Sequence, residues 1–183
     1  MHRGRLFIAL VSFYVGIGIW VGGLGVFALI AGVPFEVLSR DTAGVVNRLM
    51  LARLHVLEIA GAVLIGIALW LLNLRIRGWY WKAALVVFIA MVTLFGVYAG
   101  LLEPMMNAIA RSVSFDSPTP ETAAAIARFE GYHRLHVLLA GLTALLGVIL
   151  LGWQTWLVTR LLETTPGQEG TARQDSGLTP TES

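Results

Sequence analysis

Four long apolar segments constrain the fold of this chain more than any other feature. They run from about residue 6 to 32, 52 to 74, 83 to 102 and 135 to 158. Each is close to or above the roughly 20 residues that an α-helix needs to cross the hydrocarbon core of a bilayer. Because a bilayer offers the backbone no hydrogen-bond partners, such segments cross it as helices. We therefore expect an all-α membrane protein, a four-transmembrane-helix up-down bundle.

The composition supports this expectation. Hydrophobic residues make up 57% of the chain, charged residues only 13%, and the mean hydropathy is +0.77, whereas soluble domains carry roughly 25% charged residues. The first apolar segment resembles a secretory signal, but it is longer than a signal core and lacks a small-residue cleavage site. We expect residues 1–162 to form the transmembrane domain. Residues 163–183 are rich in Thr, Gly, Gln and Ser and are expected to be a disordered cytoplasmic tail.

The distribution of Lys and Arg predicts the orientation in the membrane. The side that holds both termini carries seven of them, Arg3, Arg5, Arg75, Arg77, Lys82, Arg160 and Arg173, whereas the other side mixes both signs of charge. Five tryptophans, Trp70, Trp79, Trp81, Trp153 and Trp156, also lie toward the side of the termini, as in the aromatic belt of a membrane interface. We therefore expect a multi-pass protein of the cell membrane with both termini in the cytoplasm.

Small residues at intervals of four predict where the helices approach each other, because lipid is as apolar as Leu and close backbone contact drives association. One pair occurs in each apolar segment: Gly18 and Gly22, Ala62 and Gly66, Gly96 and Gly100, and Ala140 and Ala144.

Ionisable residues of three segments should meet at the side opposite the termini. This predicted polar cluster comprises Arg53, His55, Glu58, Glu103, His133, Arg134 and His136. The two arginines are placed at its rim, and the others continue the small-residue stripes at helical spacing and so should face the bundle. Glu58 lies about one turn inside its apolar segment, with His55 as its expected partner. The alternative is that these residues are polar only because headgroups and water are near, with the arginines reaching outward.

The residue types of the cluster leave several chemistries open. Histidine and carboxylate side chains suit the relay of protons or the binding of a small cation. The pairs His55 with Glu58 and His133 with His136 each place two metal ligands on one helical face, and Met50, Met105 and Met106 would suit a soft ion. Haem would need His55 and one histidine of the last segment as axial ligands. The sequence requires no cofactor and excludes neither a metal ion nor haem.

Other functions are disfavoured. The chain has no cysteine, and it has no nucleophile elbow, metalloprotease motif, phosphate-binding loop or dinucleotide fingerprint, so we expect no enzyme. A formal charge of only +2 does not suggest nucleic-acid binding. The expected partners are the lipid bilayer and a second copy of the chain, because four helices enclose little volume for a transport path.

Short motifs resemble a known family. Trp20-Val-Gly-Gly23, Pro34-Phe35, Leu102-Glu-Pro104 and Phe129-x-x-Tyr132-His133 resemble the transmembrane protein 205-like family of small four-helix membrane proteins. The resemblance implies that Glu103, Pro104 and His133 occupy recurrent polar positions of that family. Family members often carry Ser three residues and Asn seven residues after the histidine, where this chain has His136 and Ala140. Because the family's activity is poorly defined, the resemblance implies an architecture more than a mechanism.

These observations favour a small integral membrane protein of transport or membrane-homeostasis type, whose cluster binds or relays a cation or protons. A non-enzymatic scaffold or assembly protein is the first alternative. A metal- or haem-binding membrane protein is the second.

Overall fold

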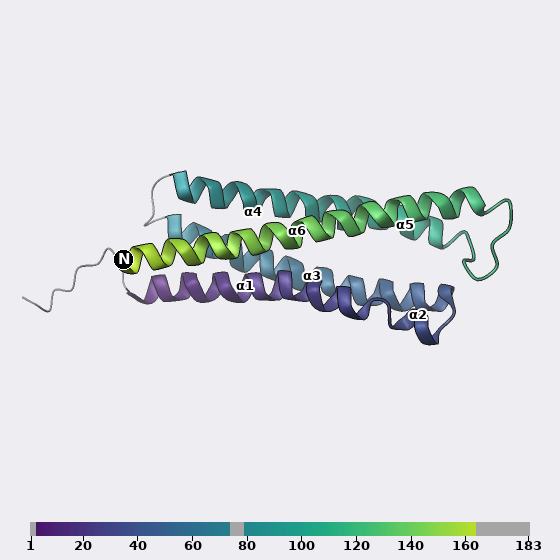
Figure 1. The fold of residues 1–183 in the computed structure, drawn as a ribbon, viewed down its shortest axis with the longest axis horizontal. Helices are drawn as coiled ribbons and strands as arrows, with labels where there is room; N and C mark the ends of the chain where they lie inside the picture. The colour runs from purple at the N-terminus through teal and green to yellow at the C-terminus, as the bar shows by residue number, and fades with distance from the viewer. Residues whose placement is uncertain (1–2, 74–78, 164–183) are drawn as a thin grey trace, which may run out of the picture.

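The computed structural model describes residues 3–73 and 79–163. Four long helical segments lie side by side and alternate in direction (Figure 1). They are α1 (Arg3–Ile30), α3 (Arg40–Asn73), α4 (Trp79–Val97) continued by η1 (Tyr98–Leu102) and α5 (Glu103–Ala110), and α6 (Ala123–Glu163), with the short α2 (Pro34–Val37) between α1 and α3. The four segments form a closed ring, in which α1 contacts α3, α3 contacts α4, α4 contacts α6 and α6 contacts α1. The expected up-down bundle is confirmed for this part of the chain.

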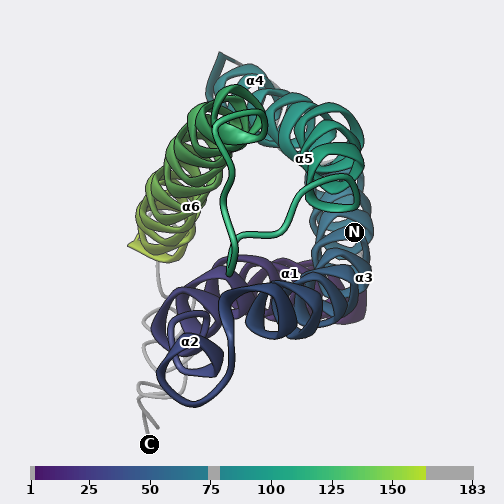
Figure 2. The same ribbon diagram turned by 90° about the vertical axis from the view of Figure 1, so that its right-hand side faces the viewer.

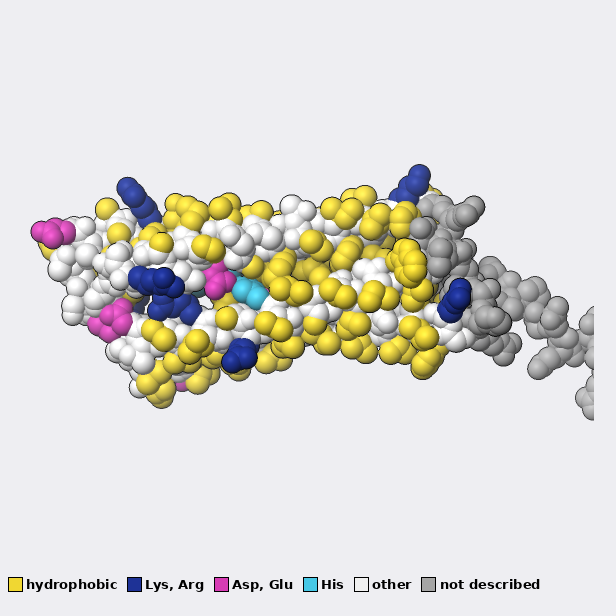
Figure 3. Space-filling view, turned by 180° about the vertical axis from the view of Figure 1, so that it is seen from behind, with side chains coloured by type: hydrophobic (Ala, Val, Ile, Leu, Met, Phe, Trp, Pro, Cys, Tyr) yellow, Lys and Arg dark blue, Asp and Glu magenta, His cyan; other side chains and the backbone are white. Residues whose placement is uncertain are grey.

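Four helices are long and apolar enough to cross a membrane. Large apolar side chains point outward along them, such as Phe7, Val86 and Leu138, each more than 60% exposed. Figure 3 shows hydrophobic side chains over the middle of one long face, with charged side chains near the two ends. Such a surface requires an apolar solvent, as an integral membrane protein has.

Two ends of the bundle are named from here on. The terminal end holds the start of α1, the end of α3, the start of α4 and the end of α6 (Figure 1). The loop end holds α2, α5 and the connection from α5 to α6 (Figure 2). The predicted tail, apart from Glu163, which ends α6, and the basic residues Arg75, Arg77 and Arg173 lie outside the described residues.

Three helical segments extend further toward the loop end than their apolar segments predicted. The second begins at Arg40 instead of Ala52, the third ends at Ala110 instead of Leu102, and the last begins at Ala123 instead of Leu135. The apolar segment shows only the part of a helix that lipid surrounds, whereas the helix continues as long as its backbone is hydrogen-bonded. At 1.5 Å per residue, the 41 residues of α6 span about 60 Å, roughly twice the hydrocarbon thickness.

A reciprocal hydrogen-bonded clasp stabilises the loop end. Asp116 accepts hydrogen bonds from the backbone N–H groups of Arg40 (2.8 Å) and Asp41 (3.3 Å), which open α3. Asp41 in turn accepts from the Ser114 hydroxyl (2.6 Å) and the Phe115 N–H (2.7 Å). A carboxylate at a helix N-terminus satisfies N–H groups that have no partner within the helix. The connection between α5 and α6 is thereby held across the loop end, as Figure 2 shows.

A π-helical turn interrupts the third segment, which was predicted as one regular helix. Pro104 has no N–H to donate to the carbonyl of Gly100, and its ring would collide with that carbonyl in an α-helix. The chain adds one residue to the turn instead, so that the N–H of Glu103 bonds the carbonyl of Tyr98. Such turns change which side chains share a face of the helix.

The most extensive helix contact is between α1 and α3, and its close backbone approach differs from the predicted small-residue pairs. A Cβ atom on Gly16 would lie 2.9 Å from the Gly61 carbonyl oxygen, and one on Gly61 would lie 2.8 Å from that of Gly16. A Cβ on Gly18, Gly22, Gly96 or Gly100 would meet nothing within 4 Å. The prediction is therefore wrong for the first and third segments, because the four-residue spacing does not show which face of a helix meets its neighbour. Ala62, Ala140 and Ala144 do pack against the buried core.

We expect Gly61→Ala to lower the free energy of unfolding by about 1–3 kcal/mol, the usual cost of overpacking. The added methyl group would collide with backbone, which cannot move aside as a flexible side chain can. Thermal unfolding of detergent-purified protein measures the change. Gly18→Ala is the matched control, since its Cβ would have open space; equal loss in both variants would contradict the α1–α3 contact.

Candidate functional site

His55 of α3 bridges two carboxylates that belong to different helices. Its Nδ1 atom lies 2.6 Å from Oε2 of Glu58 on the same helix, and its Nε2 atom lies 2.6 Å from Oε2 of Glu103 at the start of α5. The spacing of three residues between His55 and Glu58 places both on one face of α3. Both ring nitrogens are therefore engaged, and the imidazole connects α3 to α5 across the bundle.

Glu58 lies at the buried end of this arrangement. Its side chain is 0% exposed, whereas those of His55 and Glu103 are each 14% exposed. The free oxygen of Glu58, Oε1, accepts a hydrogen bond from the hydroxyl of Tyr98, which is also fully buried. A carboxylate without water needs such partners, since an unpaired buried charge costs several kcal/mol.

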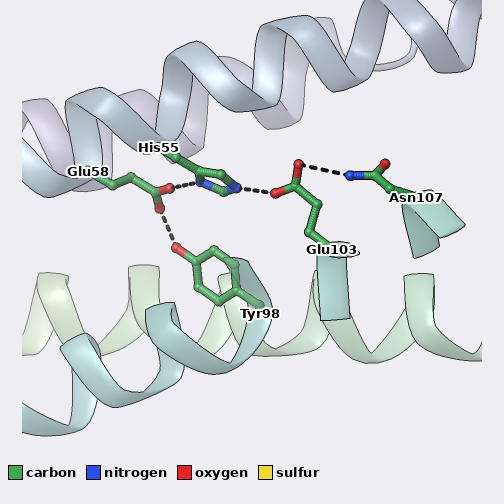
Figure 4. A network of polar contacts seen from close by, with 5 residues as sticks. All are labelled: His55, Glu58, Tyr98, Glu103 and Asn107. Carbon is green, nitrogen blue, oxygen red and sulfur yellow. Dashed lines mark hydrogen bonds and ion pairs between the residues drawn. The ribbon is translucent and has the colours of Figure 1, made fainter. Parts of the chain in front are cut away.

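A continuous chain of polar contacts results. It runs from Asn107, whose amide lies 3.5 Å from Oε1 of Glu103, through Glu103, His55 and Glu58 to Tyr98 (Figure 4). We call these five residues the polar chain. The π-helical turn makes the chain possible, because Tyr98 and Glu103 are five residues apart and would diverge by about 140° on a regular α-helix of 3.6 residues per turn. In Figure 4 the side chains of both residues point from the η1–α5 helical segment toward α3.

The charge balance of the polar chain indicates what it can do. Two carboxylates and one imidazolium carry one net negative charge, and a neutral imidazole beside one carboxylic acid gives the same sum. Protons can therefore shift along both hydrogen bonds without changing the total charge. The arrangement therefore offers a hydrogen-bonded path for a proton between Glu103, which is partly exposed, and Glu58, which is buried.

His136 lies beside the polar chain without joining it. The residue is 7% exposed, and its ring meets that of Tyr98 edge-on with 5.2 Å between centroids. Its Nε2 atom is buried and has no hydrogen-bond partner among the described residues. The prediction that His136 faces the bundle is confirmed, but the structure shows no bond from it to a carboxylate of the polar chain.

Three other members of the predicted polar cluster lie outside the site. Arg53 and His133 are exposed, and the ring of His133 stacks on Phe129 of its own helix with 6.2 Å between centroids. Arg134 is 81% exposed and pairs with Glu130 at 3.7 Å. The rim position of the arginines fits their exposure. The inward placement of His133 is wrong: the residue continues the stripe of Ala140, Gly147 and Gln154 at seven-residue spacing, but its side chain is exposed near the loop end.

The structure gives little support to a metal or haem site at these residues. Within residues 3–73 and 79–163, no group of three or more His, Asp or Glu side chains is arranged to hold a metal ion. His55 could bind a metal or a haem iron only after giving up one of its carboxylate bonds. The proposed ligand pair of His133 and His136 is divided between an exposed and a buried side chain.

Tyr98 and Asn107 belong to the site but were not predicted from the sequence. Tyr98 precedes Glu103 by five residues, a spacing that aligns two side chains only across a π-helical turn. Pro104 could have indicated that turn, because a proline within a helix removes a backbone hydrogen bond. Asn107 follows Glu103 by four residues and could have been found by ordinary helical spacing.

The chain matches no family model, no curated protein and no solved structure.

Proposed function

We propose that this protein is a small integral membrane protein of transport or membrane-homeostasis type that binds and relays protons along the polar chain. The single observation that carries the proposal is the unbroken contact from Glu103, which is partly exposed, through His55 to Glu58, which is fully buried. An ionisable residue inside a membrane segment is costly and normally serves a function. The resemblance to the transmembrane protein 205-like family, which rests on the motifs around Glu103, Pro104 and His133, remains part of this proposal.

A proteoliposome assay tests the proposal. The purified chain is reconstituted into vesicles that contain a pH-sensitive dye, and an inward pH gradient is imposed with potassium and valinomycin to balance charge. A relay that reaches across the membrane gives faster acidification than empty vesicles do. Proton uptake by the detergent-purified protein without faster acidification would instead indicate a proton-binding site open to one side. If the protein gave neither faster acidification nor proton uptake, the proposal would be contradicted.

A scaffold function is the second candidate, and one observation favours it. Two hydrogen bonds of the polar chain join α3 to the helical segment formed by α4, η1 and α5. They link His55 to Glu103 and Glu58 to Tyr98. Side-chain hydrogen bonds between helices stabilise membrane bundles, although by only about 0.6 kcal/mol each. If the chain were purely structural, changing its charge would alter stability without any effect on proton movement.

We further propose that the polar chain faces the non-cytoplasmic side. The proposal rests on the basic residues and tryptophans of the terminal end. A reporter that is active only outside the cytoplasm should be inactive when fused after Thr164 and active when inserted after Ser117. The reverse pattern would place the polar chain at the cytoplasmic side.

A further inference from the structure

His136 of α6 is a buried titratable residue that the polar chain does not use. The buried polar side chains of the part that the structure describes are Glu58, His136, Thr143 and Gln154, and only Glu58 and His136 can carry a charge. An imidazole is the side chain whose charge ordinarily changes between about pH 5 and pH 8. A buried imidazole beside a charged network therefore requires an explanation of its own.

Contact with Tyr98 places His136 at the buried end of the polar chain. The two ring planes meet at 75°, with 5.2 Å between centroids. The hydroxyl of Tyr98 donates its hydrogen bond to Glu58 (Figure 4). One aromatic side chain thus connects His136 with the buried carboxylate, and α6 joins the site that α3, η1 and α5 form.

The Nε2 atom of His136 is buried, and no described residue offers it a hydrogen bond. Buried polar atoms of native proteins are nearly always paired, so each exception indicates strain, an unseen partner or a functional role. Both ring nitrogens of His55, in contrast, are engaged by carboxylates. His136 is therefore an imidazole of the site with a ring nitrogen that is not committed to another group.

The groups around the His136 ring include both carboxylates of the polar chain. The titratable groups in contact with the ring or within its electrostatic reach are His55 and Glu58 on α3, Tyr98 on η1, Glu103 on α5 and His133 on α6 itself. The other helices packed against α6, α1 and α4, carry charged side chains only in their first turns, at the terminal end. Nearby opposite charges favour the charged form of a titratable group, whereas burial opposes it.

From its burial, its unpaired nitrogen and its contact with Tyr98, we infer that His136 is a proton-accepting residue of the site. A proton from water bonds to an imidazole nitrogen, and no hydrogen bond of the polar chain has to break. The polar chain together with His136 then changes from one net negative charge to none. This inference rests on the proposed function, because it adds His136 to the groups that bind protons.

Nuclear magnetic resonance of the histidine rings tests the inference. The chain contains four histidines, so labelling the rings with carbon-13 gives four signals, which single His→Gln variants assign. The detergent-purified full chain is titrated from about pH 8 to about pH 5, the range in which an imidazole ordinarily titrates. We expect the His136 signal to titrate in this range. Glu58→Gln should weaken its proton binding about tenfold, which corresponds to about 1.4 kcal/mol of lost attraction.

A matched control separates the polar chain from general charge. Glu130→Gln removes a carboxylate from α6 itself, but that side chain is 53% exposed, and the titration of His136 should stay unchanged. If His136→Gln failed to fold, the other three histidine variants would still assign the signal of His136 by elimination.

Two results would overturn the inference. A His136 signal that stays constant over the whole titration would show that the ring is a neutral packing group. Equal effects of Glu58→Gln and Glu130→Gln would show that the ring responds to net charge and not to the polar chain. If the wild type took up or moved protons while the His136 signal stayed constant, this inference would fail and the proposed function would stand.

Discussion

Glu58→Gln is expected to abolish proton movement through the reconstituted protein while leaving the bundle folded. Gln keeps the volume of the side chain and can still bond to His55 and Tyr98, but an amide neither takes up nor releases a proton near neutral pH. The carboxylate it replaces is fully buried between those two partners. Because a membrane hydrogen bond is worth only about 0.6 kcal/mol, we expect a change in unfolding free energy of that order and an activity at the level of empty vesicles.

A matched control makes the result specific. Glu130→Gln removes a carboxylate near the same end of the bundle, but that side chain is 53% exposed and pairs with Arg134 at 3.7 Å. It should retain the full rate and its dependence on pH. If Glu58→Gln kept the wild-type rate and pH dependence, the relay function would fail and the scaffold function would become the better explanation.

The main course of the chain could be predicted from the sequence because lipid imposes a simple rule. Every backbone group inside a bilayer must be hydrogen-bonded, so a long apolar segment becomes a helix. The short sequence connection before Trp79 makes α3 and α4, the helices on either side of it, antiparallel. The rule does not cover backbone outside the lipid. The start of α3 at Arg40 depends on a carboxylate 76 residues away, Asp116, whose contact cannot be read from local sequence.

The candidate site could be predicted only in part, for a geometric reason. His55, Glu58 and Glu103 were placed together because helical spacing and antiparallel packing determine which end of the bundle they share. The same reasoning failed for His133, because helical spacing gives the direction of a side chain but not whether a neighbouring element covers it at that level; His133 shares its direction with Ala140 and Gly147 and is nevertheless exposed. It also missed Tyr98, which reaches Glu58 only because the turn before Pro104 is π-helical.

The bridging position of His55 leads to the largest expected effect on stability. Removing it by His55→Ala leaves the carboxylates of Glu58 and Glu103 without the cation between them, one fully buried and the other 14% exposed. Removing one partner of a buried ion pair typically costs about 3–5 kcal/mol, because the remaining charge keeps its desolvation penalty. We expect a loss of that size in unfolding free energy at pH 7.

The dependence of this loss on pH follows from the same charges. In the variant, the two carboxylates repel each other and lack compensation only while both are ionised. Acid supplies a proton that can neutralise one of them, so the loss should shrink between about pH 7 and pH 5. Thermal unfolding of wild type and variant in parallel, from about pH 5 to pH 7, measures the difference.

A second substitution identifies the cause. In the double variant His55→Ala, Glu58→Gln, the buried charge is gone together with its partner, so most of the lost stability should return, and the remaining difference should no longer vary with pH. A cavity left by the missing imidazole would behave differently, because adding Glu58→Gln could not fill it. If the double variant were as unstable as His55→Ala alone at every pH, the imidazole would act by packing, and the charge balance assigned to the polar chain would be wrong.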